Sequence, residues 1–271
     1  MDFKIIELAR KELHRIENEH KCEIVLAGFI GSCINGLGNE KSDFDIRAIS
    51  LGGDSIEDSF FVSYNYGSIC LETKIYPFDR IYRDLKEWKS VKKEYPTILS
   101  NMQHPFVHDD ISRNIVRLSL ISPILQSSSF IHNHVVFIND SLSVIEALDY
   151  EYSRAYMNFH KFLCNEKVNV RKYLYTLLEI FSLHWILENI SFPGDFISLL
   201  SYINPSGYLS GIINDLLEIN LTECKENLFI EKKDCINKYI ENELKILNKK
   251  IINFADENFN LKFTPNFLLN G

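Results

Sequence analysis

The chain has no continuous apolar run of the about 18 to 20 residues that a membrane-spanning helix needs. We therefore expect no membrane span. Its six cysteines include no Cys-x-x-Cys pair, so neither a zinc knuckle nor a disulfide framework is indicated. The N-terminal stretch is charged throughout, unlike a secretory signal peptide. Together these features predict a reduced, cytoplasmic protein.

Two common catalytic motifs are also missing. No Gly-x-x-x-x-Gly-Lys-Ser/Thr is present, which excludes a P-loop NTPase at the motif level. No Gly-x-Ser-x-Gly elbow indicates hydrolase chemistry. The net charge of −8 argues against tight non-specific binding to duplex DNA, because that binding depends on many lysines and arginines. A local basic patch that holds one nucleotide or one RNA end is compatible with this charge.

A glycine-serine pair and an aspartate pair stand out in the first fifty residues. The apolar stretch 23–29 predicts a strand that leads into Gly31 and Ser32, and Asp43 and Asp45 open a second apolar strand. Gly31 allows a phosphate to approach the backbone. The Ser32 hydroxyl and the amides after it, at a predicted helix start, can donate to that phosphate.

The two aspartates have the spacing of a metal-binding pair. Side chains alternate along a strand, so Asp43 and Asp45 point to the same face. Neighbouring carboxylates repel each other unless a cation lies between them, and oxygen ligands suit Mg²⁺ or Mn²⁺. The alternative is ordinary turn chemistry at a strand entry. Arg47 follows on the same face, where it either pairs with the carboxylates, the favoured interpretation, or binds a substrate phosphate.

A third carboxylate, Glu72, lies in the predicted strand 68–76. Cys70, Glu72 and Lys74 share one face of that strand. Two-metal phosphoryl transfer usually needs such a third carboxylate, and Lys74 is then a candidate substrate-binding cation. The alternative is an exposed glutamate on an edge strand that faces Lys74.

The joint pattern resembles the signature of the nucleotidyltransferase superfamily that includes DNA polymerase beta. More narrowly, GSCINGLGNEKSDFDIRAI resembles the Gly-Ser-Arg-Ala-Tyr-Gly…Ser-Asp-Tyr-Asp-Val-Arg-Gly-Val block of the YcgL-like predicted nucleotidyltransferases linked to RNA repair. In polymerase-beta-like enzymes the third carboxylate comes from a later strand beside the aspartate pair. Glu72 matches that position, so the resemblance implies catalytic and metal-binding roles for Asp43, Asp45 and Glu72.

A second block, VNVRKYLYTLLEIFSLHWILEN, resembles the Lys-Lys-Tyr-x-Tyr-x-Leu-Arg-Pro helix of the same group. Lys172 in this block is a candidate triphosphate contact, with a solvated helix-face lysine as the equal alternative. The chain also departs from the group, since Cys33 and Leu178 stand where the group has arginines, and Glu179 where it has proline.

The resemblance implies an α+β fold, with a polymerase-beta-like nucleotidyltransferase core of a small mixed sheet with helices, followed by a helical C-terminal domain. We place the core at residues 1–110 and a helical substrate-binding domain at 111–271. Asn204 is the predicted N-cap of one of the helices. Apolar periodicity predicts helices over residues 3–16, 79–88, 111–125, 141–163, 169–189, 204–220 and 224–257.

The implied function is metal-dependent transfer of NMP from an NTP to a hydroxyl acceptor, with release of pyrophosphate. By resemblance the acceptor is an RNA end, for example of tRNA, with a small molecule or a protein hydroxyl as alternatives. The missing arginines also motivate a nucleotide- or RNA-binding protein of the same fold with reduced catalysis. A toxin-type enzyme that adenylylates a protein would use the same site.

Overall fold

The chain forms two compact units in the computed structural model. The sheet unit comprises Met1–Ile34, Lys41–Leu142 and Thr264–Gly271, and the helical unit comprises Asn35–Glu40 and Ser143–Phe263. The sheet unit thus extends beyond residue 110, and a short segment of the N-terminal part packs with the helices. The structure describes residues 3–39, 42–53, 59–81, 83, 124–128, 144–191, 193–222 and 228–258.

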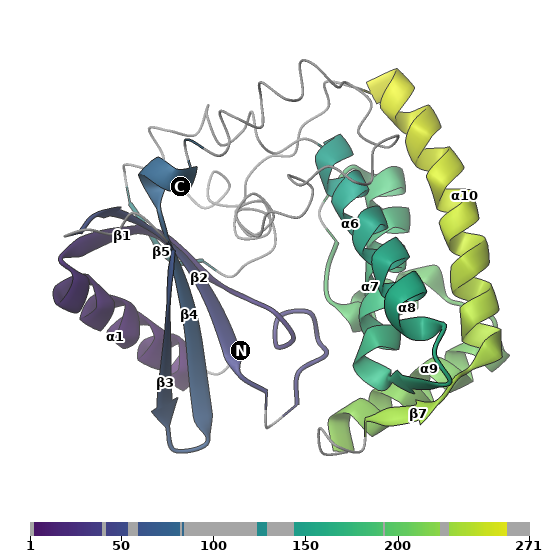
Figure 1. The fold of residues 1–271 in the computed structure, drawn as a ribbon, viewed down its shortest axis with the longest axis horizontal. Coiled ribbons are helices and arrows are strands. Elements are labelled where there is room, and N and C mark those ends of the chain that lie inside the picture. The colour runs from purple at the N-terminus through teal and green to yellow at the C-terminus, as the bar shows by residue number, and fades with distance from the viewer. Residues whose placement is uncertain are drawn as a thin grey trace. The chain divides into compact units, whose positions relative to one another are not determined.

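The sheet unit is built on one five-stranded mixed sheet with the strand order β3-β4-β2-β1-β5 (Figure 1). Strands β2 and β4 are parallel, and the other neighbours are antiparallel. The elements are α1 (Phe3–His20), β1 (Cys22–Ile30), β2 (Phe44–Gly52), β3 (Phe60–Tyr66), β4 (Ile69–Pro77) and β5 (Ile124–Ser127). The mixed sheet predicted from the sequence is confirmed.

Helix α1 covers one face of this sheet. Its apolar stripe, which includes Leu13 and Ile16, packs in one buried cluster with Phe29 of β1 and with Ile46 and Ala48 of β2. Because side chains alternate along a strand, the odd-numbered positions of β2 face away from α1. Asp45 and Arg47 therefore lie on the opposite face of the sheet from this core.

The helical unit is organised around α7, most of whose side chains are buried. Helix α7 packs against α6, α8, α9 and α10. The elements are α6 (Val144–Asn158), the π-helical turn η3 (Phe159–Leu163), β6 (Lys167–Asn169), α7 (Val170–Asn189), α8 (Phe196–Ile203), α9 (Gly207–Thr222), β7 (Phe229–Glu231) and α10 (Asp234–Asn258). The predicted helical C-terminal region is confirmed. In the part of the chain that the structure describes, no helix combines the length and apolarity that crossing a membrane requires.

Several predicted boundaries differ from the structure. Asn204 is not an N-cap: it ends α8 in the left-handed conformation with φ of 45°, and α9 begins only at Gly207. The predicted helix 224–257 begins later, at Asp234, because β7 precedes it and pairs with β6.

Two other predicted helices lie largely outside the described residues. The helix predicted over 111–125 ends on Ile124 and Leu125, and these belong to strand β5, because tertiary pairing with β1 overrides the helical periodicity. Residues 78–81 and 83 are helical, in agreement with the start of the helix predicted over 79–88.

Candidate active site

The bend at Gly31 is shaped by the carboxylate of Asp45. Gly31 follows β1 with φ of +83°, a conformation that residues with a β-carbon rarely adopt. A β-carbon added to Gly31 would overlap Asp45 Oδ2 and lie 3.0 Å from Asp45 Cγ. The position therefore requires glycine for two separate reasons, and the Asp45 carboxylate lies directly against the bend.

The helix predicted to start after Ser32 is absent. The chain instead makes successive turns from Ser32 to Gly36, where φ is again positive at +72°. Within these turns the Cys33 thiol donates to the carbonyl oxygen of Asp43, with an S···O distance of 3.5 Å. This contact connects the turns to the entry of β2. Because residues 32–36 form turns, Ser32 lies in a loop and not at a helix N-terminus.

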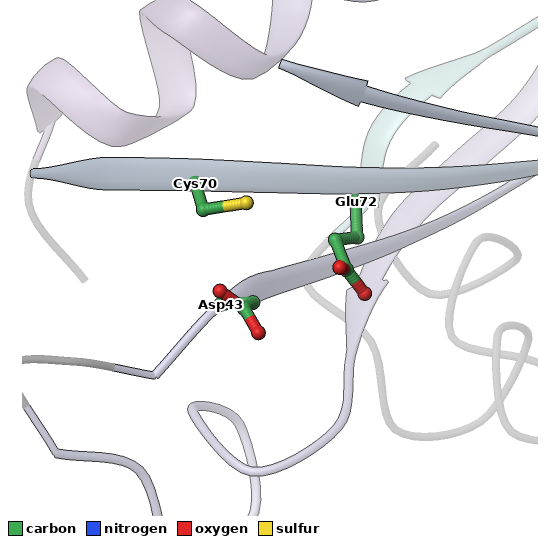
Figure 2. A group of neighbouring side chains, drawn as sticks. All are labelled: Asp43, Cys70 and Glu72. Carbon is green, nitrogen blue, oxygen red and sulfur yellow. The ribbon is translucent and has the colours of Figure 1, made fainter. Parts of the chain in front are cut away.

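The parallel pairing of β2 with β4 brings the predicted carboxylates together. Asp45 is the register partner of Glu72, and Arg47 is the partner of Lys74. One ligand atom each from Asp43, Cys70 and Glu72 lies within 4.8 Å of the others. Figure 2 shows these three side chains pointing toward one another, two from β4 and one from the entry to β2.

Negative charge accumulates in this cluster. Burial raises the pKa of the Asp45 carboxyl above its usual value; Arg47 opposes this effect, and the charges of Glu72 and Asp43 add to it. The Arg47 guanidinium lies beside these carboxylates, with its Nη1 3.9 Å from Asp45 Oδ1. Arg47 thus takes the pairing role that the sequence favoured. The cluster contains Asp43 and Glu72, and Asp45 lies beside Glu72 on the neighbouring strand. Such partly buried carboxylates are a suitable site for a divalent cation.

Cys70 was not among the predicted site residues. The structure places its thiol within the ligand cluster, and the signal was present in the sequence, because Cys70 precedes Glu72 by two residues on one strand. A thiol beside carboxylates adds a softer ligand, which favours Mn²⁺ over Mg²⁺ more than an all-oxygen site would.

The remaining predicted cations lie in different surroundings. The Lys74 ammonium lies 5.1 Å from the centre of the Tyr76 ring in the sheet unit. Lys172 belongs to the helical unit, where its ammonium lies 4.2 Å from the centre of the Phe162 ring. Burial lowers the pKa of Lys172, and the nearby cations Arg154 and Lys161 lower it further, against the opposing effect of Glu179. Lys172 is therefore not simply a solvated helix-face lysine.

Comparison with known families places the chain in a family. The family described as RNA repair pathway DNA polymerase beta family, RlaP, matches residues 114–262, more than half of the 271 residues. The chain belongs to this family. It is thereby a member of the polymerase beta superfamily of nucleotidyltransferases, as the resemblance implied. The match begins after Glu72, so the three carboxylates lie outside the matched residues, and their catalytic and metal-binding roles stay predictions.

One solved structure found by comparison is a nucleotidyltransferase-like protein from Exiguobacterium sibiricum 255-15. It is 10% identical, with 91% of this chain and 76% of that chain covered, and the TM-score is 0.30. No curated protein matched the sequence.

Within the RlaP family match, the positions that depart from the YcgL-like pattern have structural roles. Leu178 is buried in α7. Glu179, fully buried beside it, pairs with Arg154 at 2.8 Å between Oε1 and Nε and accepts a hydrogen bond from Asn158 at 3.1 Å. This chain therefore uses the expected Arg-Pro positions for core packing and a buried ion pair.

The segment 35–39, between the Gly31 bend and Asp43, is held by Asn220 of α9. The buried Asn220 side-chain amide donates to the Leu37 carbonyl at 2.9 Å, and the Asn220 carbonyl accepts from the Asn39 amide at 3.0 Å. The Asn220 Oδ1 also accepts from Arg171 Nε at 3.2 Å. One asparagine thus connects the start of α7 with the loop that precedes the aspartate pair.

Replacing Asn220 with alanine is expected to lower the free energy of unfolding by about 2–3 kcal/mol, because the Leu37 carbonyl loses its buried donor. Amide hydrogen exchange over residues 35–39 should become faster in the same variant. Asn214→Ala, an exposed position on the same helix, is the matched control. Equal stability and equal exchange in the two variants would show that Asn220 does not hold this segment.

Proposed function

We propose that the protein transfers NMP from an NTP to a hydroxyl acceptor and releases pyrophosphate, using a divalent metal held by the sheet unit. The observation that carries this proposal is the cluster that contains Asp43 and Glu72, with Asp45 beside Glu72 in the sheet register and against the Gly31 bend. Membership in a polymerase beta family supports the same reaction class.

Asp43, Asp45 and Glu72 would hold Mg²⁺ or Mn²⁺. The residues fit such an ion, since burial raises the pKa of the Asp45 carboxyl and the charges of Glu72 and Asp43 add to this effect, against the opposing effect of Arg47. A bound ion would neutralise phosphate charge and lower the pKa of the acceptor hydroxyl. Glu72, next to Asp45 in the sheet, is also the proposed proton acceptor.

The other residues of the site would bind substrate. The backbone at Gly31 and the Ser32 hydroxyl would donate to the triphosphate, and Lys74 would add positive charge from the same sheet face as Glu72. Arg47, beside Lys74 in the register, would orient Asp45 and approach a phosphate. Lys172, which the sequence offered as a candidate triphosphate contact, lies in the helical unit and would bind a phosphate there. The acceptor would be an RNA end, in keeping with the RNA repair pathway in the family description.

A transfer assay with two differently labelled NTPs tests this function. With Mg²⁺ and a single-stranded RNA acceptor, label from the α-phosphate should enter the RNA, and label from the γ-phosphate should leave as pyrophosphate. Removal of the metal with EDTA should reduce transfer to the background, since the carboxylates alone would repel the phosphates.

Four results would contradict the proposal in different ways. Transfer of the γ-label would indicate a kinase, and transfer that survives EDTA would exclude the metal. Label in a protein band rather than in RNA would replace the RNA acceptor with a protein hydroxyl. Metal-dependent NTP binding by calorimetry without pyrophosphate release would indicate a binding protein.

A further inference from the structure

A cavity of about 360 Å³ opens where α7 begins in the helical unit. Its walls come from η3, β6, the first turns of α7 and β7, which pairs with β6. The lining residues that matter here are three cations and three aromatic residues: Lys167, Arg171, Lys172, Phe162, Tyr175 and Phe229. Among the described residues, no aspartate or glutamate lines this cavity.

The cations of the cavity are arranged without acidic partners. Within the described part of the chain, Lys167, Arg171 and Lys172 form no ion pair, although Glu231 is the register partner of Lys167 in the β6–β7 ribbon. The Arg171 guanidinium is oriented by its hydrogen bond to Asn220. In a chain with a net charge of −8, such a group of cations is suited to an anionic ligand rather than to a neutralised surface.

The aromatic residues add a flat apolar surface beside these cations. The Phe229 side chain is 58% exposed on β7, opposite Asn169 in the ribbon. The Phe162 ring already carries the Lys172 ammonium on its face at 4.2 Å. An exposed ring next to cations matches a ligand that has both a phosphate and a planar base, as a nucleotide does.

We propose that this cavity binds one nucleotide unit of single-stranded RNA, with its base on Phe229 and its phosphate at Arg171 and Lys172. The inference rests on the proposed function, because it assigns the acceptor of that reaction. Free NTP offers the same phosphate and base chemistry, and its proposed site is at Gly31 and Ser32 in the sheet unit. The nucleotide in the cavity is therefore a second one.

Fluorescence anisotropy with a labelled short oligouridylate measures this binding. The full chain is titrated in EDTA, which separates RNA binding from turnover. Phe229→Ala should raise the Kd about 5- to 100-fold through loss of stacking on the base. Lys172→Gln should raise the Kd about 10-fold through loss of a charged phosphate contact.

The salt dependence separates the two roles. Lys172→Gln should reduce the slope of log K against log salt by about 0.7, whereas Phe229→Ala and Lys172→Arg should leave the slope unchanged. Two exposed residues outside the cavity supply the controls: Tyr208→Ala removes an aromatic ring, and Lys249→Gln removes a charge. Both controls should bind RNA like the wild type, and thermal melts should show that every variant is folded.

Several outcomes would overturn the inference. If Phe229→Ala bound RNA with unchanged affinity, general electrostatic attraction would explain the binding. The same would follow if the variants lost as much affinity for duplex RNA as for single-stranded RNA, because the bases of a duplex are already stacked. Binding of ATP alone that displaces the RNA and is lost in Lys172→Gln would make the cavity an NTP site. Asp43→Asn/Asp45→Asn should bind RNA normally. A wild-type protein that binds RNA through this cavity but transfers no nucleotide would contradict only the proposed reaction.

Discussion

Joint replacement of Asp43 and Asp45 with asparagine is expected to lower nucleotidyl transfer at least about 10³-fold. The two carboxylates are the main ligands proposed for the metal, and a loss of about 4 kcal/mol of transition-state stabilisation corresponds to this factor. Asparagine has nearly the same shape, so the fold should persist. The measurement is single-turnover transfer of α-labelled nucleotide at saturating Mg²⁺.

Asp215→Asn provides the matched control, since it removes an exposed carboxylate from α9. This variant should transfer nucleotide at the wild-type rate. The single variant Asp43→Asn should also lower the pKa of Asp45, because the Asp43 charge is one of the influences that raise it. Wild-type transfer by the double variant would remove the aspartates from the reaction and overturn the metal assignment.

Gly31→Ala is the second substitution with a large expected effect. The new β-carbon would take the place of Asp45 Oδ2, so the carboxylate must move. Displacement of a catalytic group by about 1 Å can cost about 10²-fold in rate, and we expect a loss of this size in transfer. Alanine at this positive φ should also lower the free energy of unfolding by about 1–2 kcal/mol.

Gly67→Ala separates the clash from the backbone strain. Gly67 has a similar φ of +62°, but a β-carbon there would meet nothing within 4 Å. We expect a comparable loss of stability in denaturant titration and unchanged transfer. If both variants lost activity equally, backbone strain in the sheet unit, and not the position of Asp45, would explain the effect of Gly31→Ala.

The strand faces that carry the candidate site residues follow from local rules. The two-residue spacing of Asp43 and Asp45, and of Cys70 and Glu72, is enough to place each pair on one face of a strand. The apolar stretch before Gly31 predicted β1 in the same way. The pairing between these strands could not be predicted in this way, because the sequence pattern specifies which residues share a face but not which strands are neighbours.

The errors arose where distant contacts outweigh local preference. Asn204 with Pro205 is a reasonable helix start, yet the end of α8 places Asn204 in a left-handed cap. Ile124 and Leu125 fit a helical period, but they belong to β5, which pairs with β1 in the sheet. The cavity at Lys172 depends on β7, which the sequence assigned to a long helix.

The sequence by itself determined the two acidic strand faces, the glycine before them and the long buried helix α7, because alternation, backbone freedom and apolar periodicity are properties of neighbouring residues. Only the tertiary structure decided that β4 lies parallel to β2, that Cys70 joins the carboxylates, and that Asn220 holds the segment between bend and aspartates. These features come from pairing and packing between residues far apart in the chain, where many arrangements satisfy the same local pattern.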